Sequence, residues 1–160
     1  MQVRAIIESD RDWAASVVAG YFGTPEILSR GVRHNTLRLP GLVAEHNGSK
    51  LGLLHYRIQG KDCEVVAVIA LVKRQGVGRR LLAELVQLAR GLGCTRVWMI
   101  TTNDNRVAQE FYAAVGWRRA TVHAGAVAAA RAVKPEIPLL ARDGTPIADE
   151  IEYEFRLITE

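Results

Sequence analysis

Residues 73–80 read Lys-Arg-Gln-Gly-Val-Gly-Arg-Arg and combine glycines with basic side chains. An apolar run precedes them, and apolar residues at helical spacing follow. The first N–H groups of a helix have no partner within it, and the helix dipole favours negative charge there, so such a turn can bind a diphosphate. Glycine lets a ligand approach the backbone closely. The stretch therefore predicts a phosphate-binding turn, although a plain strand–turn–helix connection gives the same pattern.

Other anion-binding patterns fit this chain less well. A P-loop ends in Gly-Lys-Ser or Gly-Lys-Thr, which is absent, and a dinucleotide fingerprint has a third glycine where this chain has Leu81. The net charge is +4, but the remaining cations are scattered and no basic stripe is interleaved with aromatic residues, as binding of single-stranded nucleic acid would require. A polyanionic small molecule accounts for the local cluster better than nucleic acid does.

Residues 105–117 form a second pattern, Asn-x-x-Ala-x-x-Phe-Tyr-x-x-x-Gly-Trp. Its apolar residues recur at helical spacing, which predicts an amphipathic helix. Asn105 is a typical N-cap residue, so capping is one interpretation of it. Phe111 is expected in the core. Tyr112 is either core or functional, and we favour function because a buried hydroxyl needs a polar partner.

The two segments, in this order and at this distance, resemble the cofactor-binding core of the GNAT superfamily of acyl-CoA-dependent N-acyltransferases. The resemblance is closest over residues 40–118. It implies an α/β (α+β) fold with a mixed, mainly antiparallel central sheet, splayed at the cofactor site and flanked by helices. It also implies acetyl-CoA or coenzyme A as cosubstrate, without a metal.

The resemblance also assigns roles along the chain. The diphosphate of CoA would lie on N–H groups of the glycine turn, the pantetheine arm beside the preceding strand, and the sulfur near the tyrosine. The cofactor-binding residues expected on this basis are Val66, Ala67, Val68, Lys73, Arg74, Gln75, Gly76, Val77, Gly78, Arg79, Asn105 and Tyr112.

The function implied is transfer of an acyl group, in the first place acetyl, to an amine by direct attack in a ternary complex. An alkyl amine with a pKa of about 10.4 must lose a proton before it attacks, which requires a base. Asp62 and Glu64 lie on one face of a predicted strand, where the family often has a carboxylate. Glu64 is the first candidate and Asp62 the second, while a merely solvated carboxylate is the alternative. Tyr112 is the candidate acid for the departing thiolate, and strand N–H groups near residues 66–68 could stabilise the oxyanion.

Other functions stay open at this point. An acyl-CoA-binding sensor without turnover would carry the same cofactor residues, and a nucleic-acid-binding protein would show salt-dependent affinity. The expected partner is a small-molecule amine or peptide acceptor, with no nucleic acid and no membrane; a homodimer is common in such folds. Small amines, amino acids, antibiotics and protein termini all remain possible acceptors.

The cysteines and histidines give little indication of function. Cys63 and Cys94 are far apart and lack a C-x-x-C partner, so buried free thiols are expected. The histidines are scattered without ligand spacing and are expected at the surface or with satisfied hydrogen bonds; His123 is the one most worth testing. They are His34, His46, His55 and His123.

The proline-containing segment from residue 133 to 150 is expected to form an ordered loop. One hypothesis is that Arg131, Lys134 and Asp149 bias the choice of acceptor. The favoured alternative is a structural loop that closes the sheet.

The elements follow from periodicity and turn residues. A strand at residues 3–7, a helix starting near Ser9 and a short helix with loop at 24–40 come first. Asn47-Gly48 predicts a hairpin between strands at 42–46 and 50–59, followed by a strand at 62–70. Further elements are a helix at 76–90, a strand at 96–101, the helix of the second pattern, a strand before His123, a helix at 125–133 and a strand at 150–158.

The length and the apolar share predict a single domain, residues 1–160. The first ten residues become acidic too early for a signal peptide, and no run approaches the roughly 18 apolar residues of a membrane span, so a cytoplasmic location is expected.

Overall fold

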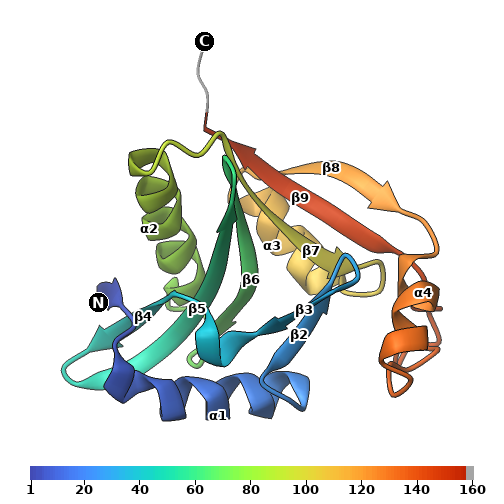
Figure 1. The fold of residues 1–160 in the computed structure, drawn as a ribbon, viewed down its shortest axis with the longest axis horizontal. Helices are drawn as coiled ribbons and strands as arrows, with labels where there is room; N and C mark the ends of the chain where they lie inside the picture. Colours follow the sequence, from blue (N-terminus) through green and yellow to red (C-terminus); the bar gives the residue numbers. More distant parts are fainter. Residues whose placement is uncertain (158–160) are drawn as a thin grey trace. The chain divides into compact units, whose positions relative to one another are not determined.

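The structure is a computed structural model that describes residues 1–157 (Figure 1). Its elements form two compact units. The first unit contains residues 1–27 and 33–97 and the described residues from Arg156, and the second contains residues 28–32 and 98–155. The single domain over residues 1–160 stays a prediction. Ile158, the expected end of the last strand, lies outside the described residues.

The first unit is built on four antiparallel strands in the order β1-β4-β5-β6 (Figure 1). Asn47 and Gly48 both have positive φ, 48° and 80°, which two-residue hairpins favour, so the predicted hairpin is confirmed. The strands are β1 (Gln2–Ala5), β4 (Gly41–His46), β5 (Ser49–Gln59) and β6 (Asp62–Ala70); the helices are η1 (Glu8–Asp10), α1 (Arg11–Phe22) and α2 (Val77–Gly91).

The two long helices of this unit cover opposite faces of the four strands, because side chains alternate along each strand. Leu53 of β5 lies in a buried cluster with Ala14 and Val18 of α1. The opposite face of the four strands packs against α2. A Cβ added to Gly52 of β5 would lie 3.2 Å from the Leu81 side chain and closer still to Val77, and both of these residues belong to α2. Glycine at position 52 therefore lets α2 pack directly on the sheet.

The short helix and loop predicted at residues 24–40 are only partly correct, because a hairpin precedes the short helix in this range. β2 (Glu26–Ser29) and β3 (Val32–Asn35) form a two-stranded sheet, followed by the short helix η2 (Thr36–Arg38). Gly31 lies in the tight turn between the two strands, with φ 76°. The strands are too short for their periodicity to stand out between the flanking prolines.

The second unit contains the remaining elements in the predicted order. β8 and β9 are antiparallel, and β9 lies between β7 and β8 (Figure 1). The strand expected before His123 is β8. The elements are β7 (Arg96–Thr102), whose first two residues fall in the first unit, α3 (Arg106–Ala114), β8 (Arg118–His123), α4 (Ala126–Val133) and β9 (Glu150–Arg156).

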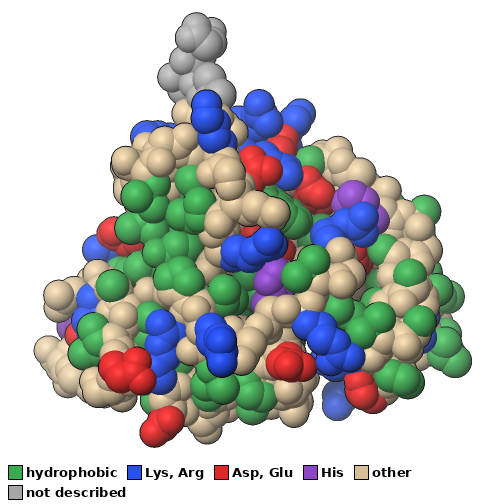
Figure 2. All heavy atoms as spheres, viewed as in Figure 1, with side chains coloured by type: hydrophobic (Ala, Val, Ile, Leu, Met, Phe, Trp, Pro, Cys, Tyr) green, Lys and Arg blue, Asp and Glu red, His purple; other side chains and the backbone are tan. Residues whose placement is uncertain are grey.

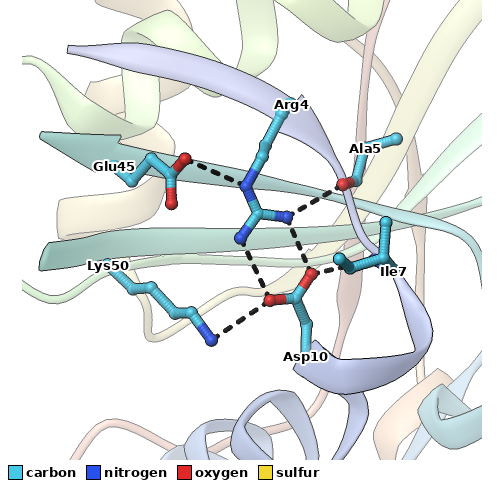
Figure 3. A network of polar contacts seen from close by, with 6 residues as sticks. All are labelled: Arg4, Ala5, Ile7, Asp10, Glu45 and Lys50. Atoms are coloured by element: carbon cyan, nitrogen blue, oxygen red, sulfur yellow. Dashed lines mark hydrogen bonds and ion pairs between the residues drawn. The ribbon is translucent and has the colours of Figure 1, made fainter. Parts of the chain in front are cut away.

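A network of charged groups fixes the start of α1 in the first unit (Figure 3). The Asp10 carboxylate is buried and accepts hydrogen bonds from Arg4 Nη1 at 2.8 Å and Nη2 at 3.0 Å, and from the Ile7 N–H at 2.8 Å. Lys50 Nζ lies 3.1 Å from the same carboxylate, and Arg4 Nε donates to Glu45 at 3.0 Å. The hydrogen bond between Ile7 and Asp10 caps η1, the short helix that leads into α1, and the N-cap of α1 itself has no side-chain hydrogen bond; the helix start expected near Ser9 lies within η1.

This network gives a stability prediction. The Arg4 guanidinium holds the pKa of the Asp10 carboxyl well below its usual range, so ionised Asp10 stabilises the fold above its unfolded pKa of about 3.9. We expect Asp10→Asn to lower the free energy of unfolding by about 3 kcal/mol near neutral pH, because it leaves the partly buried Arg4 and Lys50 without the buried carboxylate that they share. In urea unfolding, the difference from wild type should narrow as the pH falls below about 4, where wild type loses the same contribution.

Asp12→Asn is the matched control, because Asp12 is an exposed carboxylate in the first turn of the same helix. It should change the free energy of unfolding by less than about 0.5 kcal/mol. Equal losses in the two variants, or a difference independent of pH, would contradict the role of the network.

Candidate active site

The turn between β6 and α2 has the backbone geometry of an anion site. Arg74 and Gly76 have positive φ angles of 61° and 73°, and α2 begins at Val77. The Arg80 N–H donates to the Gly76 carbonyl at 2.9 Å, so the N–H groups of residues 77–79 have no partner within the helix. Positive φ is uncommon outside glycine, and residues held in such regions cluster at ligand-binding sites.

Basic side chains surround this turn. Lys73, Arg74 and Arg79 are exposed beside it. Arg80 Nε lies 3.1 Å from Glu84 in the next turn of α2, so part of its charge is neutralised. Figure 2 shows the other Lys and Arg side chains on the drawn face as separate groups, not as a continuous stripe. The charge pattern of the turn suits a compact polyanion better than an extended one.

A β-bulge interrupts β6 just before the turn. Ala67 pairs with His55 and Val65 pairs with Tyr56, so Val66 has no opposite residue in the ladder. A bulge leaves the extra residue unpaired and re-aims the side chains next to it, and bulges are common beside active sites. This irregularity lies within residues 66–68, which were predicted to contact the pantetheine arm.

The bulge also decides where Glu64 points. Without an extra residue, Glu64 would lie on the α2 face; with it, Glu64 pairs with Arg57 and joins the opposite face. Its side chain is only 5% exposed and lies 3.7 Å from Arg57 Nη1 and 3.8 Å from His34 Nε2. Asp62 differs, because its side chain is 43% exposed and lies 3.5 Å from Arg96. Of the two candidate bases, Glu64 alone lies in a buried polar cluster.

Two of the four histidines depart from the expectation of surface or satisfied rings, whereas His46 is exposed and His123 Nε2 lies 3.0 Å from Glu152, as expected. His34 and His55 are both buried, and among residues 1–157 neither ring has a hydrogen-bond partner at Nε2. The Nδ1 atom of His55 lies 3.3 Å from the Pro40 carbonyl. His34 lies near Glu64 because it belongs to the β2–β3 hairpin, which was not predicted from the sequence. No local sequence pattern could therefore have predicted that His34 is part of this cluster.

In the second unit, Asn105 caps α3: its Oδ1 accepts a hydrogen bond from the Ala108 N–H at 3.1 Å. The capping interpretation is therefore correct, and its amide nitrogen contributes nothing to that bond. A role in cofactor binding stays a prediction.

Tyr112, on the same helix, is buried, whereas Phe111, which was expected in the core, is only half-buried. Its ring lies in an aromatic cluster, with ring centres 5.5 Å from Trp117 and 5.8 Å from Tyr153. Burial raises the pKa of Tyr112 above its usual range, so the phenol is protonated at neutral pH. A protonated phenol can donate a proton but cannot serve as a base.

A family model described as the acetyltransferase (GNAT) family matches residues 12–117. The chain belongs to the GNAT family. It is 39% identical over 137 residues to the uncharacterized protein YdhI of Bacillus subtilis (strain 168), covering 84% of this chain and 85% of that protein.

The GNAT fold extends over the whole chain. A Bacillus subtilis acetyltransferase in complex with CoA superposes with a TM-score of 0.69 at 14% identity, covering 98% of this chain and 99% of that one. The structure of yncA from Salmonella typhimurium with its cofactor acetyl-CoA gives a TM-score of 0.69 at 16% identity, covering 100% and 95%. The predicted fold class, a mainly antiparallel sheet flanked by helices, is confirmed, as is the prediction of a GNAT-type acyltransferase.

In this GNAT-family protein, hydrogen bonds from side chains hold the proline-containing loop in place. Arg131 donates to the carbonyls of Ile137 at 3.2 Å and of Pro138 and Ile147 at 2.6 Å. The Asp149 carboxylate accepts a hydrogen bond from the Gly125 N–H at 2.9 Å. Arg131 therefore holds the backbone of the loop, and Asp149 joins the end of the loop to the start of α4, which favours the structural alternative.

The described residues give no sign of a reactive thiol, a metal site or a membrane-spanning helix. Cys63 and Cys94 are free and buried, and burial raises the pKa of Cys63 to about 12, which makes it a poor nucleophile. Among the residues described, His, Cys, Asp and Glu side chains form no group of three suited to a metal ion. Within residues 1–157, none of the helices combines the length and apolar character needed to span a bilayer.

Proposed function

We propose that this GNAT-family protein transfers an acetyl group from acetyl-CoA to a primary amine, which attacks the thioester directly in a ternary complex. The observation that carries the proposal is the turn before α2, where positive φ angles and N–H groups without partners within the helix follow a bulged strand. Acetyl-CoA would supply the activated acyl group. The similar structures that contain CoA or acetyl-CoA support the choice of cosubstrate.

The first unit would hold the cosubstrate mainly through its backbone. N–H groups of residues 74–79 would bind the diphosphate, with Lys73 and Arg79 adding positive charge. The backbone of residues 66–68 would bind the pantetheine arm, and an N–H beside the bulge would donate to the oxyanion. Gly76, with no atom within 4 Å of its missing Cβ, leaves open space for the ligand.

Two side chains would move protons. Glu64 would take a proton from the acceptor ammonium, since it is a buried carboxylate in a polar cluster. Tyr112 would protonate the departing thiolate, because a phenol carries its proton at neutral pH. Asn105 would support the cofactor through its amide nitrogen while its oxygen caps α3.

Glu64→Gln should lower kcat/KM for the amine about 100-fold or more, because removal of a general base typically costs that much. Asp62→Asn, on the same strand and half-exposed, is the matched control and should stay within about threefold of wild type. Both variants should retain CoA affinity. Equal losses in the two, measured by thiol release under identical conditions, would remove Glu64 as the base.

The function itself is tested by thiol release from acetyl-CoA with mixed pools of small amines, amino acids and peptides. We expect amine-dependent release with at least one pool. CoA binding without release across all pools would instead support the acyl-CoA-binding module. A small molecule or peptide is the expected acceptor class, and the pools distinguish the two.

Location and assembly are further proposals. Two buried free thiols suit a reducing compartment such as the cytoplasm. A homodimer remains a prediction that sedimentation of the purified protein can test.

A further inference from the structure

His34 is the most unusual polar residue outside the residues assigned above. It lies on β3, its side chain is 4% exposed, and its Nε2 has no hydrogen-bond partner among the described residues. Glu64 Oε1 lies 3.8 Å away, beyond hydrogen-bond distance. Buried ring nitrogens are normally paired, because an unpaired one costs free energy. His55 also has an unpaired Nε2, but only the His34 nitrogen has a carboxylate, that of Glu64, recorded close to it.

The charges around the ring explain what it can do. Arg57 Nη1 lies 3.7 Å from the same Glu64 oxygen, so its positive charge balances the carboxylate. Burial, and then the charge of Arg57, lower the pKa of His34 below its usual value, which keeps the ring neutral near pH 7. In the cluster of His34, Arg57 and Glu64, a neutral His34 ring with its hydrogen on Nδ1 can accept a proton at Nε2, 3.8 Å from the Glu64 carboxylate.

A proton would complete this cluster. A protonated His34 ring would face the Glu64 carboxylate as an ion pair, and a small approach would bring the two atoms to hydrogen-bond distance. The surroundings of His34 thus suit the imidazolium better than the neutral imidazole that is present near pH 7. Such an arrangement fits a site that receives a proton during a reaction.

We propose, resting on the proposed function, that His34 is a positioning residue that acts through Glu64 by taking over the proton that Glu64 removes from the acceptor amine. The proton leaves the ammonium nitrogen, which keeps the bonding electron pair as its lone pair. It binds a Glu64 oxygen and then passes to His34 Nε2, which restores the carboxylate and forms the imidazolium. The freed amine attacks the thioester, and the imidazolium later releases its proton to solvent.

This assignment narrows the acceptor class. A second proton-holding group is useful only for an amine that arrives protonated, as aliphatic amines with a pKa of about 10 do. Weakly basic amines such as aniline are already neutral at pH 7 and gain nothing from it. We infer that the acceptor is a strongly basic aliphatic amine.

The first test needs no acceptor. The His34 ring is titrated by NMR in the full-length wild type and in Glu64→Gln. We expect the pKa of His34 to be lower in the variant, because the carboxylate that favours the imidazolium is gone. An unchanged pKa would overturn the proposal.

The second test is kinetic. His34→Gln should lower kcat/KM for an aliphatic amine at least tenfold at pH 7, and the deficit should shrink towards pH 10, where the amine is neutral. His55→Gln is the matched control, since His55 is equally buried and also has an unpaired Nε2. Equal deficits in the two variants, or a His34→Gln deficit that is constant with pH, would overturn the proposal. Absence of amine-dependent thiol release in wild type would instead refute the proposed function, and the NMR titration would still decide whether the pair shares a proton.

Discussion

Gly76→Val is expected to raise the Kd for CoA at least about 100-fold. The residue has φ 73°, where a β-branched side chain is strongly disfavoured, so the turn must change conformation. The N–H groups of the turn would then no longer point together at the diphosphate. Loss of two hydrogen bonds to a charged group, each worth about 1.5–3 kcal/mol, accounts for an effect of this size. Titration calorimetry with CoA measures it.

Gly93→Val is the control for this variant. Gly93 follows α2 at its other end, has φ 80°, and also has no atom within 4 Å of its missing Cβ. The backbone strain introduced is therefore comparable, of the order of 1–2 kcal/mol, but no anion site is predicted there. We expect CoA affinity within about twofold of wild type. If both variants bound CoA equally well, the turn would not be the diphosphate site.

Tyr112→Phe is expected to lower kcat about 100-fold or more while leaving the Kd for CoA nearly unchanged. The substitution removes the proton donor but keeps the ring, so the contacts with Trp117 and Tyr153, at ring distances of 5.5 and 5.8 Å, are retained. Stability should change little for the same reason. Steady-state thiol release and CoA titration give the two quantities separately.

Tyr153→Phe tests the specificity of that effect. Tyr153 is buried in the same aromatic cluster and loses the same atom in the variant. We expect its kcat to stay within about threefold of wild type. Similar losses of kcat and CoA affinity in Tyr112→Phe would identify Tyr112 as a packing residue.

The turn before α2 could be predicted because its determinants are local. The glycines, the basic residues and the helical spacing after them lie within one short stretch, and the structure has a helix beginning at Val77. The Asn47-Gly48 hairpin is predictable for the same reason. Asn105 was assigned a capping interpretation from its type alone, and its hydrogen bond to Ala108 agrees with it.

The Glu64 cluster could not be predicted because it depends on two non-local features. The bulge at Val66 reverses the alternation that places Glu64, and it results from pairing with β5, not from the residues of β6 alone. His34 belongs to a hairpin whose two strands have four residues each. Strands of this length are too short to show a clear alternation of apolar and polar residues in the sequence. The relative burial of Phe111 and Tyr112 likewise depends on the aromatic residues that surround them.

The most direct measurement is a crystal structure of this protein with acetyl-CoA. We predict that the diphosphate oxygens lie within about 3.2 Å of backbone nitrogens among residues 74–79, with the thioester carbonyl beside the bulge at Val66. The account would be contradicted if the diphosphate bound elsewhere. It would also be contradicted if side chains of the protein accepted the hydrogen bonds of these N–H groups.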